Sequence, residues 1–295
     1  MVRPRETLHH MAEPVPDVVC GRWRHGGSFA SLLAVAVVCV GCSINLSSLS
    51  GSGEKDEAAP GASGSISSLS EVIRTNPNDA QAYNARGLLL AQGGKSEEAL
   101  ADLNKAINLD PAYGHAYANR ALVYRHTKRL ELAMNDYNRA IMLDPGYAPA
   151  FLGRGLIFRA RNQQAEALDD LSKAISLRPD NAEALYNRGL LYQGNKQHEL
   201  AINDFTSANG LVPQQADPLY ARAVSYLALD KPKEAASDLD EAVQAAPMNG
   251  QIWLMRGQAY EKLGDKAKAA ASYTRAIDIR PKDEAARSGM ARVGG

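Results

Sequence analysis

Apolar and small residues recur along this chain with a period of 34 residues, and prolines mark that period. Alignment on the prolines divides residues 80–283 into six copies. A period of about 20 to 50 residues indicates stacked structural units rather than a single globular core. The prolines that define the period are Pro77, Pro111, Pro145, Pro179, Pro213, Pro247 and Pro281.

Each copy predicts two helices. In the second copy, Tyr117, Ala121 and Tyr124 stand at positions 4, 8 and 11. Spacings of four and three place these residues on one helical face, where the small central residue lets a neighbouring backbone approach. The second half has alanine at positions 20 and 27 of all six copies, with a bulky residue between them. This is a second helical stripe, and the proline that follows ends the helix.

This order of residues over 34 positions resembles the tetratricopeptide-repeat (TPR) family. The resemblance covers about residues 66–283 and implies an all-α fold, a right-handed superhelix of antiparallel helix pairs. Leu69 and Val72, upstream of the first proline, predict that the array begins with a half repeat. Residues 284–295 predict a C-terminal capping helix, which covers the last apolar face as terminal repeats require.

Arginine occupies position 7 of every copy, and aspartate follows 16 residues later in the first five. A row of arginines suits an anionic ligand such as nucleic acid. The matched aspartates, which flank core positions, instead favour partly buried ion pairs between the two helices of each copy. Ser272 replaces the sixth aspartate, so Arg256 is expected to be free. The predicted structural pairs are Arg86–Asp102, Arg120–Asp136, Arg154–Asp170, Arg188–Asp204 and Arg222–Asp238.

The TPR resemblance also implies where a partner binds. In TPR arrays the first helices line the concave side, and positions 2, 5, 9, 12 and 13 face the groove. The lysine, asparagine and arginine that clamp chaperone C-termini are absent from these positions, which are mostly apolar here. Such a groove suits peptides with apolar anchors and some acidic character. The predicted groove residues are Leu88, Leu122, Arg125, Leu156, Arg159, Tyr186, Leu190, Tyr220 and Val224.

A second interpretation of the position-9 leucines stays open at this point. Leucine at helical spacing is more often core than ligand site, so these residues equally suit packing between neighbouring first helices.

Residues 1–42 predict an export leader. Arg22 and Arg24 precede an apolar run of about 12 residues, which is typical of a signal peptide and short of the roughly 20 residues that span a bilayer. The end of the run resembles the bacterial lipobox, which makes Cys42 the predicted lipidation site. Residues 43–65, rich in serine and glycine, predict a flexible tether. An ordinary cleaved signal, an uncleaved anchor and a cytosolic chain with a misassigned start are the alternatives.

Composition and motifs argue against an enzyme. The 33 basic and 33 acidic residues give no net charge that would attract nucleic acid. All three cysteines lie in the first 42 residues, and the repeats contain no phosphate-binding glycine loop, nucleophile elbow or zinc-protease motif. We therefore expect no catalytic residue, no cofactor and no metal.

The leading hypothesis is a scaffold that binds other proteins. It resembles bacterial TPR lipoproteins that act as pilus-assembly factors or protease adaptors, which implies a lipid anchor and a place at the outer membrane facing the periplasm. The alternatives are a soluble periplasmic protein and a cytosolic TPR co-chaperone or regulator.

Overall fold

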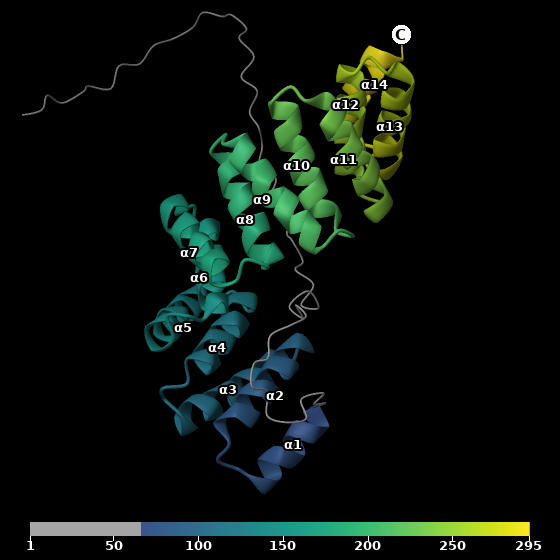
Figure 1. The fold of residues 1–295 in the computed structure, drawn as a ribbon. Helices are drawn as coiled ribbons and strands as arrows, with labels where there is room; N and C mark the ends of the chain where they lie inside the picture. Colours follow the sequence, from purple (N-terminus) through teal and green to yellow (C-terminus); the bar gives the residue numbers. More distant parts are fainter. Residues whose placement is uncertain (1–65, 295) are drawn as a thin grey trace, which may run out of the picture. The chain divides into compact units, whose positions relative to one another are not determined.

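The computed structural model describes residues 66–294, which fold entirely into helices and short turns (Figure 1). The prediction of an all-α fold built from antiparallel helix pairs is confirmed. The leader, the tether and Cys42 lie outside the described residues. The helices are α1 Ile66–Thr75, α2 Ala80–Gln92, α3 Ser96–Leu109, α4 Gly114–His126, α5 Leu130–Leu143, α6 Ala148–Ala160, α7 Gln164–Leu177, α8 Ala182–Gly194, α9 His198–Leu211, α10 Ala216–Ala228, α11 Pro232–Ala245, α12 Gly250–Lys262, α13 Lys266–Ile279 and α14 Glu284–Val293.

The period prolines end the second helices by a local steric effect. Asp110 precedes Pro111 and has φ −134° and ψ 93°, outside the helical region. Asp144, before Pro145, has almost the same backbone angles. A proline ring disfavours the α conformation of the residue before it, so each second helix stops at the same position.

In the turn inside each hairpin, the residue at position 15 adopts the left-handed backbone conformation, with a positive φ. Glycine fills this position at Gly94 and Gly264, with φ of 77° and 78°. In the other four turns a non-glycine residue has φ between 55° and 61°, at Lys128, Asn162, Lys196 and Asp230. The regular hairpin geometry therefore overrides the usual steric preference against this conformation.

The alanine columns are the core of the stack, since alanines at positions 20 and 27 are 0% exposed in every copy. Small residues at position 8 admit the bulky residue of position 24. A Cβ atom added to Gly189 would lie 2.6 Å from Cε1 of Phe205, closer than atoms can pack. The small and large positions thus interlock. The sequence predicts that the small residue admits a neighbouring backbone, whereas the atoms nearest to the added Cβ of Gly189 belong to the position-24 side chain.

Two tyrosines at position 24 extend this interlocking into the next repeat. A Cβ atom on Gly153 would lie 2.2 Å from Cζ of Tyr137, and one on Gly289 would lie 2.4 Å from Cζ of Tyr273. Both glycines stand at position 6 of the unit that follows the tyrosine. We call each arrangement a tyrosine window, because the glycine leaves room for the tyrosine ring.

Candidate functional site

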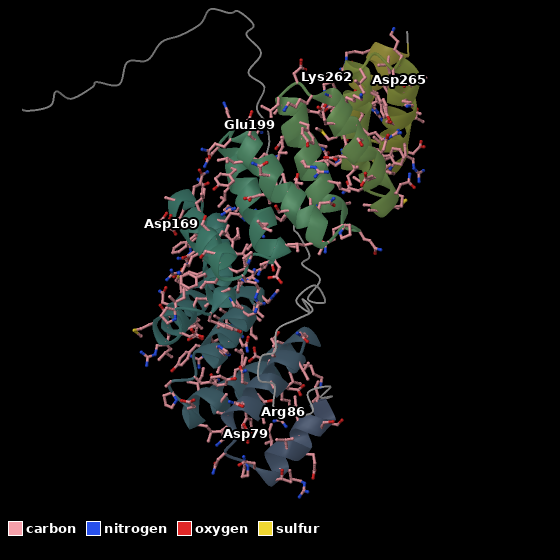
Figure 2. The ribbon with its side chains drawn as sticks, in the orientation of Figure 1. Asp79, Arg86, Asp169, Glu199, Lys262 and Asp265 are labelled. Atoms are coloured by element: carbon pink, nitrogen blue, oxygen red, sulfur yellow. The ribbon has the colours of Figure 1, made fainter. Side chains whose placement is uncertain are left out.

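The first helices form the inner layer of the array. Each of α2, α4, α6, α8 and α10 contacts the next first helix, and α12 contacts α14, whereas no comparable contact joins two second helices in residues 66–294. Charged side chains of the second helices, such as Asp169 and Glu199, are exposed (Figure 2). Every predicted groove residue belongs to a first helix, so we call the surface that these helices present the inner surface.

The position-9 residues of the inner surface divide into two groups. Leu88, Leu122, Leu190 and Val224 are half-buried, which leaves part of each side chain open to solvent. Leu156 is only 7% exposed and packs with Phe151 and other residues of the core. The inclusion of Leu156 in an accessible groove is therefore corrected, since its side chain is buried between helices.

The two predicted groove tyrosines are also partly engaged in packing. Tyr186 lies with its ring centroid 5.8 Å from that of Phe205. Burial raises the pKa of the Tyr220 hydroxyl, and a hydrogen bond with Gln251 acts in the opposite direction. Both residues remain half-buried.

Charged groups gather on the inner surface at repeats two to four. Arg125 of α4 is half-buried and Arg159 of α6 is exposed. The Tyr137 hydroxyl contacts the Arg125 side chain, and Glu183 of α8 lies within electrostatic reach of both arginines. We call Arg125, Tyr137, Arg159 and Glu183 the inner cluster. Glu183 is not among the predicted groove residues, although it stands at position 2, which TPR arrays turn toward the groove.

Two atoms of the inner cluster are buried without a hydrogen-bond partner, namely Nε of Arg125 and Oε1 of Glu183. Burial raises the pKa of the Glu183 carboxyl, while the positive charges of Arg125 and Arg159 act to lower it. Buried polar atoms are normally paired, so unpaired ones in a charged cluster indicate either a functional site or a cost carried for another reason.

The structure brings together all five predicted ion pairs. Each arginine donates two hydrogen bonds to its aspartate, with nitrogen–oxygen distances of 2.6–2.8 Å. The arginine side chains are 15–22% exposed and the aspartate side chains 7–10%. Such paired and half-buried guanidinium groups join the helices of a hairpin and have little freedom to bind an anion.

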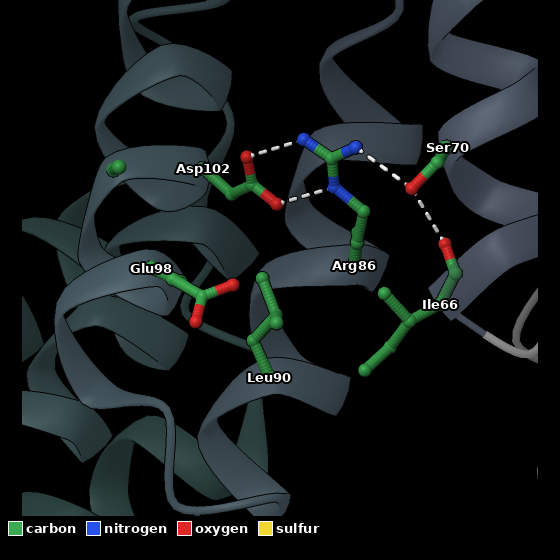
Figure 3. A pocket seen from close by; sticks show the side chains of 7 residues that line it. Ile66, Ser70, Arg86, Leu90, Glu98 and Asp102 are labelled. Carbon is green, nitrogen blue, oxygen red and sulfur yellow. Dashed lines mark hydrogen bonds and ion pairs between the residues drawn. The ribbon is translucent and has the colours of Figure 1, made fainter.

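Each of these arginines has a further partner that the sequence analysis did not identify. Figure 3 shows the first, where Arg86 also donates to the Ser70 hydroxyl of the preceding helix at 3.0 Å. The residue 16 positions before the arginine fills this role in every copy. The partners are Ser70, Asn104, Asn138, Ser172 and Thr206. The arginines therefore form a ladder that joins successive repeats as well as the helices within them.

The expectation that Arg256 is free is wrong. Its Nε donates to Asp240 at 2.7 Å, and its Nη1 donates to Ser272 at 2.7 Å. Asp240 belongs to α11, at the position where earlier repeats have serine, asparagine or threonine. The carboxylate has moved from the arginine's own hairpin to the preceding repeat, a change that inspection of one repeat alone does not reveal.

No group of three metal-binding side chains occurs in the part of the chain that the structure describes. None of the helices between residues 66 and 294 has the length and apolar character needed to cross a membrane.

Comparison with known proteins agrees with this geometry. Profiles of the tetratricopeptide repeat match residues 69–101, 87–127, 114–147, 155–196, 182–214 and 220–284, which together cover more than half of the chain. No curated protein sequence matches this chain.

Several solved structures share the fold. Pseudomonas aeruginosa PilF is 23% identical with a TM-score of 0.65, over 72% of this chain and 97% of PilF. PilW, described as a type IV pilus biogenesis factor, is 18% identical with a TM-score of 0.60, over 71% of this chain and 97% of PilW. YrrB, described as a TPR protein with an unusual peptide-binding site, is 24% identical with a TM-score of 0.50, over 64% of this chain and 96% of YrrB.

At these identities the structural similarities establish the fold and leave the biological role to other evidence. The periodic core, the hairpin stack and the matching profiles agree with one another. Repeats of this kind typically serve as non-enzymatic scaffolds for protein–protein interaction. The chain belongs to the tetratricopeptide-repeat family.

Proposed function

We propose that this protein is an exported scaffold, anchored to the membrane through lipidated Cys42, that recruits or assembles envelope proteins by binding a partner segment on its inner surface. The observation that carries the binding function is the row of half-buried apolar side chains at position 9, interrupted only where Leu156 joins the core. Partly exposed apolar side chains along a surface suit an extended or helical segment with apolar anchors.

The arginine ladder supports this function indirectly. Because it fixes the hairpins to one another, the inner surface is held in shape before a partner arrives. A preorganised surface loses less conformational entropy on binding, which favours affinity.

The export and anchoring part of the proposal rests on the apolar run and Gly41-Cys42. PilF and PilW share the fold at 23% and 18% identity, which is too distant to assign a pilus role. The alternative is a cytosolic co-chaperone or regulator with a misassigned start.

Fatty-acid labelling tests the anchor. The full-length gene is expressed in a bacterial host with a clickable fatty acid, and the wild type is compared with Cys42→Ser after membrane fractionation. Label and membrane association are expected in the wild type and in the matched control Cys39→Ser, and both are expected to disappear in Cys42→Ser. An unlabelled wild type in the soluble cytoplasmic fraction would establish the cytosolic alternative instead.

Selection from a random-peptide display library tests the inner surface. Enriched peptides are measured by fluorescence anisotropy against the wild type, Leu122→Ser and Leu190→Ser. The matched controls are Leu132→Ser and Leu200→Ser, which remove leucines that are 47% and 45% exposed on second helices. Affinity is expected to fall about tenfold in the first pair and to stay unchanged in the controls. Equal losses in both pairs would place binding elsewhere.

A further inference from the structure

The two tyrosine windows differ in the groups that surround the tyrosine hydroxyl. In the C-terminal window, the Tyr273 hydroxyl donates a hydrogen bond to the Glu261 carboxylate. Arg292 donates two more to the same carboxylate, from Nε at 2.5 Å and from Nη2 at 2.9 Å. One carboxylate is therefore held by a tyrosine hydroxyl and a bidentate guanidinium group.

The window at repeats two and three also has a tyrosine hydroxyl and a guanidinium group, but among the described residues no carboxylate forms an ion pair with that guanidinium group. Tyr137 fills the space left by Gly153, and its hydroxyl contacts Arg125. Arg125 and Glu261 both stand at position 12 of their repeats, so the arginine occupies the place where the C-terminal window has its carboxylate. The Nε of Arg125 is buried and unpaired.

In repeat four, the position-12 side chain is tied to the next first helix. Gln193 donates to the carbonyl of Ala221 at 2.7 Å and to the Ser225 hydroxyl at 2.8 Å. Among the described residues, Arg125 and Arg159 make no comparable hydrogen bond across the inner surface. These two guanidinium groups are thus the position-12 groups whose charge is not used to hold neighbouring repeats together.

Glu183 is the one acidic side chain of the inner cluster. Its single negative charge does not balance the two positive charges of Arg125 and Arg159. Within residues 66–294, Glu183 interacts with Arg125 and Arg159 through charge and forms no direct ion pair with either, and its Oε1 is buried without a partner. Two guanidinium groups and one carboxylate leave a net positive charge on a largely apolar surface. The half-buried Arg125 is less screened by water than a surface charge and therefore attracts an anionic group of a partner, and the exposed Arg159 adds a second positive charge.

We propose that the inner cluster is the binding site for an aspartate or glutamate side chain within an apolar partner segment. Arg125 and Arg159 hold the incoming carboxylate, and the hydroxyl of the buried Tyr137 supports the Arg125 side chain. This inference rests on the proposed function and specifies the partner for the same surface. A side chain within a segment is favoured over a chain terminus because half-buried apolar position-9 residues also occur on the first helices before and after the cluster, at Leu88 of α2 and Val224 of α10.

Glu183 has a defined part in this proposal. Its carboxylate shares the field of the two arginines and competes with the incoming carboxylate for them. Removal of the Glu183 charge is therefore expected to strengthen binding, whereas removal of the arginines weakens it.

Peptide selection on the folded protein tests the proposal. A random-peptide display library is selected against the full chain, and enriched peptides are expected to contain aspartate or glutamate flanked by apolar residues. The best peptide and its Asn or Gln counterpart are then measured by fluorescence anisotropy. Loss of a charge-assisted hydrogen-bonded pair is expected to weaken binding about 10- to 100-fold.

Variants separate the cluster from general electrostatics. Arg125→Gln/Arg159→Gln is expected to weaken the acidic peptide as much as the amide replacement does, with no further effect when both changes are combined. The matched control Arg139→Gln/Arg275→Gln removes the same charge from exposed second-helix positions and is expected to leave affinity unchanged. Tyr137→Phe is expected to weaken binding about threefold, and Glu183→Gln to tighten it about threefold. Circular dichroism checks that each variant is folded.

Each other outcome has a definite meaning. Peptides that bind through leucine positions but ignore the amide replacement would overturn the carboxylate site and leave the proposed function intact. Binding that disappears when only the peptide C-terminus is amidated would overturn the assignment to a side chain. Equal weakening by the control arginine pair would show a nonspecific charge effect. Failure to enrich any peptide on the inner surface would count against both proposals.

Discussion

The ladder and the inner cluster use the same chemical groups in opposite ways. In the ladder, every guanidinium group has a carboxylate partner, which is bidentate in the first five repeats, and a further polar partner. Most also have an aromatic ring beside them, as Arg120 has Tyr117 and Tyr124. In the inner cluster, Arg125 and Glu183 each have a buried atom without a partner. The ladder recurs in every repeat, and the inner cluster occurs once.

Recurrence separates structural charges from site-specific charges in a repeat protein. A charge that recurs with its partner at every repeat contributes to the architecture, because every repeat has the same packing problem. A charge that occurs in one place and lacks direct pairing serves something specific to that place. The two regions should therefore respond differently to substitution, the ladder in stability and the inner cluster in binding.

The largest expected effect comes from removing one carboxylate of the ladder. Asp170→Ala leaves the half-buried Arg154 without its bidentate partner, and breaking such a pair costs about 3 kcal/mol of unfolding free energy. The matched control is Asp169→Ala, because Asp169 is the adjacent, exposed aspartate.

Urea unfolding followed by circular dichroism measures the change in unfolding free energy. Because repeat arrays can open locally, hydrogen exchange is expected to place the loss in repeat three and the repeats next to it. A loss in Asp170→Ala no greater than in the control would mean that the ladder does not hold the hairpins together.

The second effect concerns the tyrosine window beside the inner cluster. Gly153→Ala places a Cβ atom 2.3 Å from the Tyr137 hydroxyl oxygen, so the ring must move. Overpacking of this kind costs about 1 to 3 kcal/mol. Gly210→Ala is the control, because nothing lies within 4 Å of its added Cβ and alanine is the better helix former. Thermal unfolding should show a lower midpoint for the first variant and an unchanged or higher one for the second.

Comparison of sequence and structure shows which features were predictable. The hairpins and the five ion pairs follow from residues that recur within one 34-residue copy, so Arg120 and Asp136 could be matched by spacing alone. The contacts between copies could not be predicted in this way. The pairing of Arg256 with Asp240 and the proximity of Glu183 to Arg125 depend on how successive hairpins are rotated, which no single copy encodes.

The third effect concerns Asp240, the carboxylate that the preceding repeat supplies to Arg256. Asp240→Asn removes the charge that joins Arg256 and Tyr260 to α11. The expected loss is about 1 kcal/mol, less than for Asp170, because the Asp240 side chain is 43% exposed and partly screened by solvent. Hydrogen exchange should show faster opening of repeat six.

Ser272→Asp, combined with Asp240→Asn, restores the arrangement of the first five repeats and should recover part of this stability. If the double variant opens no more slowly than Asp240→Asn alone, the position of the carboxylate matters beyond its charge.

The smallest effect is a pH-dependent gain in the inner cluster. Burial raises the pKa of the Glu183 carboxyl above its value in the unfolded chain, despite Arg125 and Arg159. The folded protein then binds this proton more tightly than the unfolded chain does, so the unfolding free energy falls as pH rises through the interval between the two pKa values. Glu183→Gln removes this pH-dependent loss of unfolding free energy. The variant is expected to be more stable than the wild type by on the order of 0.5 kcal/mol at pH 7.

The gain should vanish when the pH falls below the unfolded pKa of glutamate, about 4.3, because both side chains are then neutral. Paired urea titrations of wild type and Glu183→Gln at pH 7 and pH 4 measure this difference, while Glu199→Gln, at an exposed position, should show no gain at either pH. A variant less stable than wild type at pH 7 would mean that Glu183 neutralises the arginines after all. The inner cluster would then be structural like the ladder, and the contrast between the two regions would be lost.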